Sequence, residues 1–146
     1  MPFVQVIAPN KALGKSQQDT LISRLSNAVR KAERAPIDDS GAQSLVWAYY
    51  HEMNNGAIYV GGENPETAPF RIAITTPEGA LSDETRGDLA QDIGAIIDDI
   101  VGPYPDRLGH WLMLTELDEG SWAGGEQIFP LAGIQQAMNI PAKQSS

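Results

Sequence analysis

The stretch PFVQVIAP, which runs from Pro2 to Pro9, has a similar counterpart in PFRIAITTP, which runs from Pro69 to Pro77. Each is a short, mostly apolar run that begins and ends at proline, a pattern typical of a β-strand bounded by turns. Because the two stretches resemble each other, they predict equivalent strands in two halves of one chain.

The similarity between the two halves continues beyond these strands, and it keeps the same order along the chain. The matching positions are Trp47 and Trp111, Glu52 and Glu116, and the triplets Gly61–Glu63 and Gly124–Glu126. Similarity at a fixed order of positions indicates an internal repeat. We therefore predict a single domain over residues 1–130, built from halves 2–65 and 69–130, with a C-terminal segment over 131–146.

Each half shows the pattern of a strand, an amphipathic helix and a second strand. The predicted strands are 3–8, 45–50, 70–75 and 111–115, and Ser16 and Ser82 are placed to begin the two helices. The first helix is expected to end near Pro36. The apolar positions at helical spacing are Leu21, Ile22, Leu25, Val29 and Ala32, then Leu89, Ile93, Ile96, Ile97, Ile100 and Val101.

A strand-helix-strand unit implies a parallel pair with a right-handed crossover. Two such units predict an α/β (α+β) fold: a four-stranded mixed sheet with both helices on one face. We expect the other face to remain apolar and the chain therefore to form oligomers. The side chains expected there are Val4, Val6, Val46, Ile72, Ile74 and Leu112. Strand-like pieces over 57–60 and 127–129 are expected to pair with a neighbouring chain, and 131–138 to form a short helix that packs over a neighbour.

Composition and charge exclude several classes of function. The net charge of -9 argues against nucleic acid as a partner, because a phosphate backbone requires a basic face. The chain contains no cysteine and only two histidines, His51 and His110, without metal-ligand spacing, so we expect neither a metal nor another cofactor. No apolar run reaches the length of a membrane span, and no secretory signal is evident. These patterns predict a cytoplasmic protein without a membrane partner.

Pro2 is the candidate catalytic residue. An initiator methionine is usually removed when the next side chain is small, and removal of Met1 would leave a secondary amine at the start of a strand. An α-amino group titrates near ~7.7–8.0, and burial in an apolar pocket lowers that pKa. Pro2 would then be a general base with little rotational freedom. The alternative is an ordinary N-terminus, and retention of Met1 would leave an amide nitrogen, which is no base.

These features together resemble the tautomerase superfamily over residues 2–130. The matching segments of the first half, which resembles 4-oxalocrotonate tautomerase, are Pro2, Thr20–Ile22, Ala35–Pro36, Glu52–Met53, Gly56 and Gly61–Glu63. In the second half, Arg86–Gln91 and Trp122 are similar to segments of the double-length members, cis-3-chloroacrylic acid dehalogenase and malonate semialdehyde decarboxylase. The resemblance implies a duplicated β-α-β fold, a homotrimer and a catalytic N-terminal proline.

The chain also departs from the motifs of this superfamily. Trp47 and Trp111 stand where the tautomerase has a substrate-binding arginine, and Glu78 and Leu81 stand where the dehalogenase has paired arginines. The positions of the dehalogenase's catalytic His, Tyr and Glu are occupied by Val29, Met113 and Gly124. Hydrolytic dehalogenation and the known decarboxylation are therefore disfavoured, because each needs a cation to hold the substrate carboxylate.

Five residues are candidates for binding the substrate: Trp111, Trp122, Arg34, Arg71 and Lys15. The resemblance places Trp111 and Arg34 near pocket positions of macrophage migration inhibitory factor. The alternative for the tryptophans is ordinary core packing. The alternative for the three cations is a solvated position at a helix or strand end.

The function predicted on these grounds is keto–enol tautomerisation of a small 2-keto acid, with Pro2 as the general base. The tryptophans favour an aryl substrate. Two alternatives remain open. The first is a hydratase, dehalogenase or decarboxylase with a non-standard site, which a carboxylate such as Glu78 or Glu126 in the pocket would favour. The second is a non-catalytic trimeric binding protein, which retention of Met1 would favour.

Overall fold

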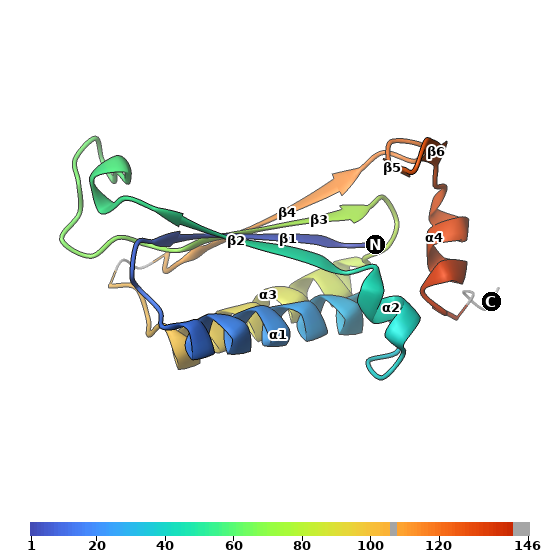
Figure 1. The fold of residues 1–146 in the computed structure, drawn as a ribbon, viewed down its shortest axis with the longest axis horizontal. Coiled ribbons are helices and arrows are strands. Elements are labelled where there is room, and N and C mark those ends of the chain that lie inside the picture. The colour runs from blue at the N-terminus through green and yellow to red at the C-terminus, as the bar shows by residue number, and fades with distance from the viewer. Residues whose placement is uncertain (106–107, 142–146) are drawn as a thin grey trace.

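The computed structural model describes residues 1–105 and 108–141, and it is built around one four-stranded sheet. Two parallel pairs, β1–β2 and β3–β4, are joined by an antiparallel contact between β1 and β3, so that the strand order is β2-β1-β3-β4. The strands are β1 (Phe3–Pro9), β2 (Trp47–Met53), β3 (Arg71–Pro77) and β4 (Trp111–Leu117). Helices α1 (Lys15–Ala32) and α3 (Asp83–Ile100) lie side by side under one face of the sheet (Figure 1). The predicted duplicated β-α-β fold is confirmed.

The two long helices begin differently. Helix α3 begins after Ser82, as predicted, and Ser82 Oγ accepts a hydrogen bond of 3.1 Å from the Thr85 backbone N–H. Helix α1 begins after Gly14 rather than at Ser16, and the Gly14 backbone N–H donates to Gln17 Oε1 at 3.1 Å. The glutamine side chain thus satisfies a backbone donor at this terminus. Among the described residues, no helix combines the length and the apolar character needed to cross a membrane.

The core lies between the sheet and the two long helices, and it corrects the prediction for the sheet faces. Val4, Val6, Ile72 and Ile74 are at most 1% exposed and contact the helices instead of the open face. Leu112 packs against the same core, and Val46 precedes β2. The open face carries the alternate residues Phe3, Gln5, Ile7, Trp47, Tyr49, His51, Arg71, Ala73, Thr75, Trp111, Met113 and Thr115. The prediction was wrong because successive strand side chains point to opposite faces, and the helices cover the more uniformly aliphatic set.

The smaller elements lie at the two ends of the sheet. The predicted strand over 57–60 is wrong: residues Asn55–Ala57 form the 3-10 turn η1, and an isolated bridge joins Val60 to Glu63. The second predicted piece contains β6 (Gln127–Ile128), which pairs with β5 (Ala123–Gly124) of the same chain.

The C-terminal segment contains the predicted short helix. Helix α4 (Leu131–Ala137) packs on its own chain, because Ile134 and Met138 are buried in one cluster with Ala42 of α2 (Ser40–Ser44). We had expected this helix to cover a neighbour. Of the C-terminal segment over 131–146, residues 142–146 lie outside the described part of the chain.

Candidate active site

The direction of the strands separates the candidate residues into two groups. Strands β1 and β2 begin at the end of the sheet where the N-terminus lies, whereas β3 and β4 begin at the opposite end (Figure 1). Pro2 therefore lies at one end of the sheet. Arg71 is opposite Ile7, the fifth residue of β1, and Trp111 is opposite Arg71. Within one chain, Pro2 and the pair Arg71–Trp111 lie at opposite ends.

Pro2 is held in a buried position at the beginning of β1. Its side chain is less than 2% exposed, and its carbonyl oxygen accepts a hydrogen bond of 3.3 Å from the Trp47 backbone N–H. The Met1 side chain packs into an apolar cluster, and the Met1 amine donates to Met138 Sδ at 2.7 Å. The other members of this cluster are Ala35, Ala42, Leu45, Val46, Trp122, Phe129, Ile134 and Ile140. The Met1 side chain thus lies among apolar groups, next to the buried Pro2.

Glu33 is the ionisable side chain next to this N-terminus. Its side chain is 1% exposed, and Oε2 lies 3.7 Å from the Met1 amine nitrogen. Burial raises the pKa of Glu33 to about 7, and the positive amine opposes that shift. Burial also lowers the pKa of the Met1 amine, against the opposing effect of Glu33. For both groups the loss of solvation outweighs the attraction of the partner, so the neutral forms are favoured.

Arg34 follows Glu33 and lies just beyond the end of α1. It has a φ of 63°, a left-handed conformation that glycine normally occupies at this position. Its backbone N–H donates to the Lys31 carbonyl oxygen at 3.0 Å. A small cavity of about 30 Å³ adjoins Glu33 and Arg34, and Ser82 and Thr85 at the start of α3 also line it. The arginine side chain is exposed at this cavity.

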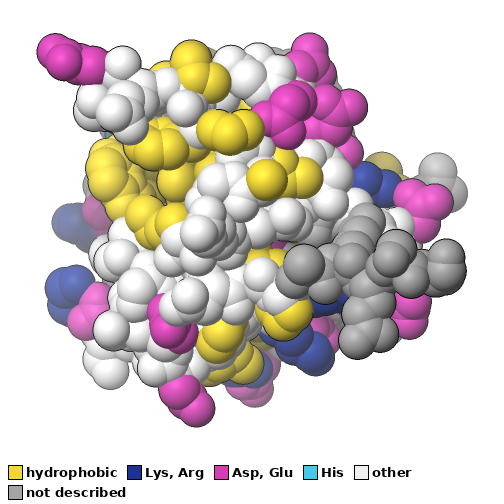
Figure 2. All heavy atoms as spheres, turned by 90° about the vertical axis from the view of Figure 1, so that its right-hand side faces the viewer, with side chains coloured by type: hydrophobic (Ala, Val, Ile, Leu, Met, Phe, Trp, Pro, Cys, Tyr) yellow, Lys and Arg dark blue, Asp and Glu magenta, His cyan; other side chains and the backbone are white. Residues whose placement is uncertain are grey.

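Several charged groups at this end of the molecule are engaged in structural contacts. Figure 2 shows apolar side chains gathered on this face with acidic groups at its border. Glu78 accepts a hydrogen bond of 3.1 Å from the Glu119 backbone N–H, and Glu119 accepts one of 3.0 Å from Leu131 at the start of α4. Arg86 pairs with Asp83 and Glu116. Glu78 therefore has a structural partner, and Glu126 is exposed.

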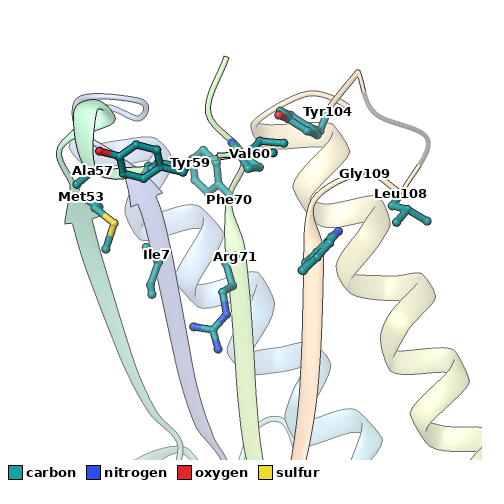
Figure 3. A pocket seen from close by; sticks show the side chains of 14 residues that line it. Ile7, Met53, Ala57, Tyr59, Val60, Phe70, Arg71, Tyr104, Leu108 and Gly109 are labelled. Atoms are coloured by element: carbon teal, nitrogen blue, oxygen red, sulfur yellow. The ribbon is translucent and has the colours of Figure 1, made fainter. Parts of the chain in front are cut away.

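A large apolar cavity of about 600 Å³ lies at the opposite end of the sheet. Figure 3 shows Tyr59, Phe70 and Tyr104 around it and Arg71 extending from β3 below them. Trp111 also lines this cavity, and Arg71 Nε donates to Met113 Sδ at 3.3 Å. This cavity thus adjoins Pro69, the repeat counterpart of Pro2, which is linked to Ala68 and has no amine.

The structure brings together some of the predicted site residues. Trp122 packs against the cluster that contains Met1, and Arg34 adjoins Glu33, so both lie near Pro2. Lys15 is the first residue of α1, has a side chain that is 77% exposed and pairs with Asp19. It lies far from Pro2, because α1 begins at the other end of the sheet (Figure 1).

Sequence reasoning missed Glu33. A glutamate next to an arginine at the end of a helix is usually solvated. The spacing nevertheless indicates that Glu33 continues the buried face of the helix. It follows Leu25 by eight residues and Val29 by four, and both of these residues are fully buried. A carboxylate on the buried stripe of a helix is a candidate for a functional role.

The raised pKa of Glu33 predicts a pH dependence of stability. The pKa of Glu33 in the folded state, about 7, lies above its ordinary value of 4.5. The protonated Glu33 side chain therefore contributes fully to the free energy of unfolding below pH 4.5, and this contribution is lost as the pH rises through 7. At about 1.4 kcal/mol for each unit of pKa shift, the free energy of unfolding should fall by on the order of 3 kcal/mol. Urea unfolding at pH 5 and pH 8 should show this loss in the parent protein and not in Glu33→Gln. Equal pH dependence of the two proteins would contradict it.

The comparisons with known proteins rest on structure. No family model and no curated protein matches the sequence. The chain is similar to native fused 4-OT, with a TM-score of 0.72 and 18% identity over 86% of this chain and 94% of that one. It is similar to N1, a member of the cis-3-chloroacrylic acid dehalogenase family, with a TM-score of 0.74 and 15% identity over 92% and 87% of the two chains. It is also similar to Q0 fused 4-OT, a symmetric trimer, with a TM-score of 0.71 and 16% identity over 90% and 97%.

These similarities establish the class of fold. The chain has the fold of the tautomerase superfamily, in its duplicated form. At this level of identity, the similarity defines the architecture, and the chemistry must be argued from the site itself.

Proposed function

We propose that the protein is an enzyme that catalyses keto–enol tautomerisation of a small 2-keto acid, with the Pro2 nitrogen as general base after Met1 is removed. One observation carries the proposal: burial lowers the pKa of the Met1 amine, and the Pro2 nitrogen would become the terminal amine in the same apolar surroundings once Met1 is removed. An amine whose pKa lies near the working pH is suited to abstract a proton next to a carbonyl.

The residues around Pro2 support this class of substrate. Arg34 is an exposed cation at the small cavity beside Glu33, and we propose that it binds the substrate carboxylate. Its left-handed backbone supports a role for this side chain, because glycine would be less strained there. Trp122 and Phe129 offer an apolar wall, which fits an aryl or other apolar substituent.

The other proposed binding residues require a second chain. Trp111, Arg71 and Lys15 can act on a substrate at Pro2 only from a neighbouring protomer, because they lie at the far end of the sheet. We propose a homotrimer, as in the fused 4-OT structure that is a symmetric trimer. The open sheet face supports assembly, because Trp47, Tyr49 and Trp111 are 62%, 57% and 58% exposed on it.

Light scattering at micromolar concentration is expected to give a mass of about three chains. Tyr49→Asp should lower that mass, because it places a charge among the aromatic side chains of the open face. Ser23→Asp is the matched control, since it adds the same charge on an exposed position of α1, on the helical side of the molecule. A measured mass of one chain for the parent protein would contradict the proposed homotrimer.

Glu33 favours a second candidate function. A buried carboxyl group beside the terminal amine can activate water, so a hydratase of the same fold is the alternative. Halide release or hydration of an unsaturated acid, without enolisation of a keto acid, would favour this alternative over a tautomerase.

Two measurements test the proposed function. Mass analysis of the purified protein shows whether Met1 is absent, and an absorbance assay follows enolisation of phenylpyruvate. Turnover with Met1 absent is expected. Retention of Met1 without turnover would favour a non-catalytic binding protein, because the Pro2 nitrogen would be part of a peptide bond.

A further inference from the structure

Glu33 lies at the end of α1, buried against the N-terminus. We propose that Glu33 is the acid partner of Pro2, donating a proton to the carbonyl oxygen of the substrate while the Pro2 nitrogen removes the neighbouring C–H proton. This inference rests on the proposed function, and it adds a second group that carries a proton in the same reaction.

The position of the Met1 amine shows how close a substrate atom could lie to both Glu33 and Pro2. Its nitrogen lies 3.7 Å from Glu33 Oε2. Covalent geometry places the same nitrogen roughly 3 Å from the nitrogen of Pro2. A substrate atom bound at this position, once Met1 is removed, is therefore within reach of both groups. The 3.7 Å separation is longer than the roughly 2.6–3.2 Å of a catalytic hydrogen bond, but such contacts are often long without substrate and shorten when it binds.

The second carboxyl oxygen of Glu33 is also informative. Oε1 is buried and has no hydrogen-bond partner among the described residues. Buried polar atoms are nearly always paired, so an unpaired one requires an explanation. The small cavity of about 30 Å³ that Glu33 lines has room for one small polar group. A substrate oxygen or an exchanging proton would satisfy it.

The charges around Glu33 favour a protonated acid next to a neutral base. Burial disfavours the charge on Glu33 and on the terminal amine alike. Among the described residues that line the cavity, Arg34 is the charged side chain besides Glu33. Arg30, nearby in the sequence, does not line it, and its guanidinium donates to the Ile37 carbonyl oxygen and to Asn27. The groups that line the cavity from α3, α4 and the segment after it are uncharged: Ser82, Thr85, Gln135, Ile140 and Pro141. A neutral amine and a protonated carboxyl are the pair that enolisation needs.

The proton transfers balance as follows. The Pro2 lone pair forms an N–H bond as the C–H bond of the substrate breaks, and that bonding pair becomes the C=C bond of the enol. The carbonyl π pair moves to oxygen, which takes the proton of Glu33 and leaves a carboxylate. After the enol departs, the Pro2 ammonium returns its proton to the Glu33 carboxylate, which restores both groups.

Glu33→Gln tests the proposal, because glutamine keeps the size of the side chain and cannot donate an acidic proton. With Met1 confirmed absent, we expect kcat for phenylpyruvate enolisation to fall by about 10²-fold. The parent should lose activity as the pH rises through about 7, where Glu33 loses its proton, and the variant should lack this alkaline decline. Glu33→Asp keeps an acid and should retain the decline. Glu84→Gln, the same change at an exposed position of α3, should match the parent.

The outcomes separate the roles of the two residues. Unchanged kcat and pH profile in Glu33→Gln, with Pro2→Ala inactive, would overturn the acid role and leave the base intact. A lower kcat in Glu33→Gln with the alkaline decline preserved would assign Glu33 to structure alone and would also overturn the proposal. If the parent protein lacks Met1 and still shows no turnover, the proposed roles of both Pro2 and Glu33 are overturned.

Discussion

Replacement of Pro2 by alanine is expected to lower the rate of phenylpyruvate enolisation by about 10²-fold or more, the usual contribution of a positioned general base. Alanine leaves a primary amine that is more mobile, because it lacks the ring that restricts the proline nitrogen. In the parent protein without Met1, kcat/KM should rise with pH through an ionisation below the ordinary α-amino value of 8.0, because the Pro2 amine would lie in the surroundings whose burial lowers the pKa of the Met1 amine.

Pro65→Ala is the control for this experiment. Pro65 is a proline within the chain, half-buried in the loop before β3, and its nitrogen cannot titrate. Its replacement should leave the rate nearly unchanged. Equal activity of Pro2→Ala and the parent, with Met1 confirmed absent in both, would exclude proline as the base.

Ile72→Ala should lower the free energy of unfolding by about 2–5 kcal/mol, the typical cost of deleting a buried aliphatic side chain. Ile72 is 1% exposed in β3, beside Val6 and Leu112 and under the two long helices. Urea unfolding measures the change. The loss should be the same at every protein concentration, because the contacts lie within one chain.

Ser23→Ala provides the reference for this loss. Ser23 is an exposed residue of α1, and its replacement should change stability by less than about 0.5 kcal/mol. A similarly small effect of Ile72→Ala would show that the helices do not cover this face of the sheet.

The repeat and the apolar periodicity were sufficient to predict the duplicated β-α-β fold. The apolar spacing from Leu89 to Ile97 placed α3, and Ser82 marked its start, because helix periodicity and capping depend on residues close in sequence. The same local reasoning identified Pro2 as the candidate base, since its amine depends on position in the chain alone.

The covered face of the sheet depended on contacts between distant segments. Val4 and Phe3 are both apolar, and a strand pattern assigns them to opposite faces without stating which face the helices cover. Docking of α1 and α3 buries Val4 and leaves Phe3 on the open side with Tyr49, whose ring centroid lies 5.1 Å away.

The composition of the site depended on the path of the chain in three dimensions. Trp111 and Pro2 were grouped from the sequence, yet they lie at opposite ends of the sheet because β1 and β3 run antiparallel. Glu33 was assigned no role, yet packing of the N-terminus against the end of α1 removes its carboxyl group from water. A pattern along the chain specifies which faces are apolar, whereas desolvation of one carboxyl group arises from the packing of segments that are distant in sequence.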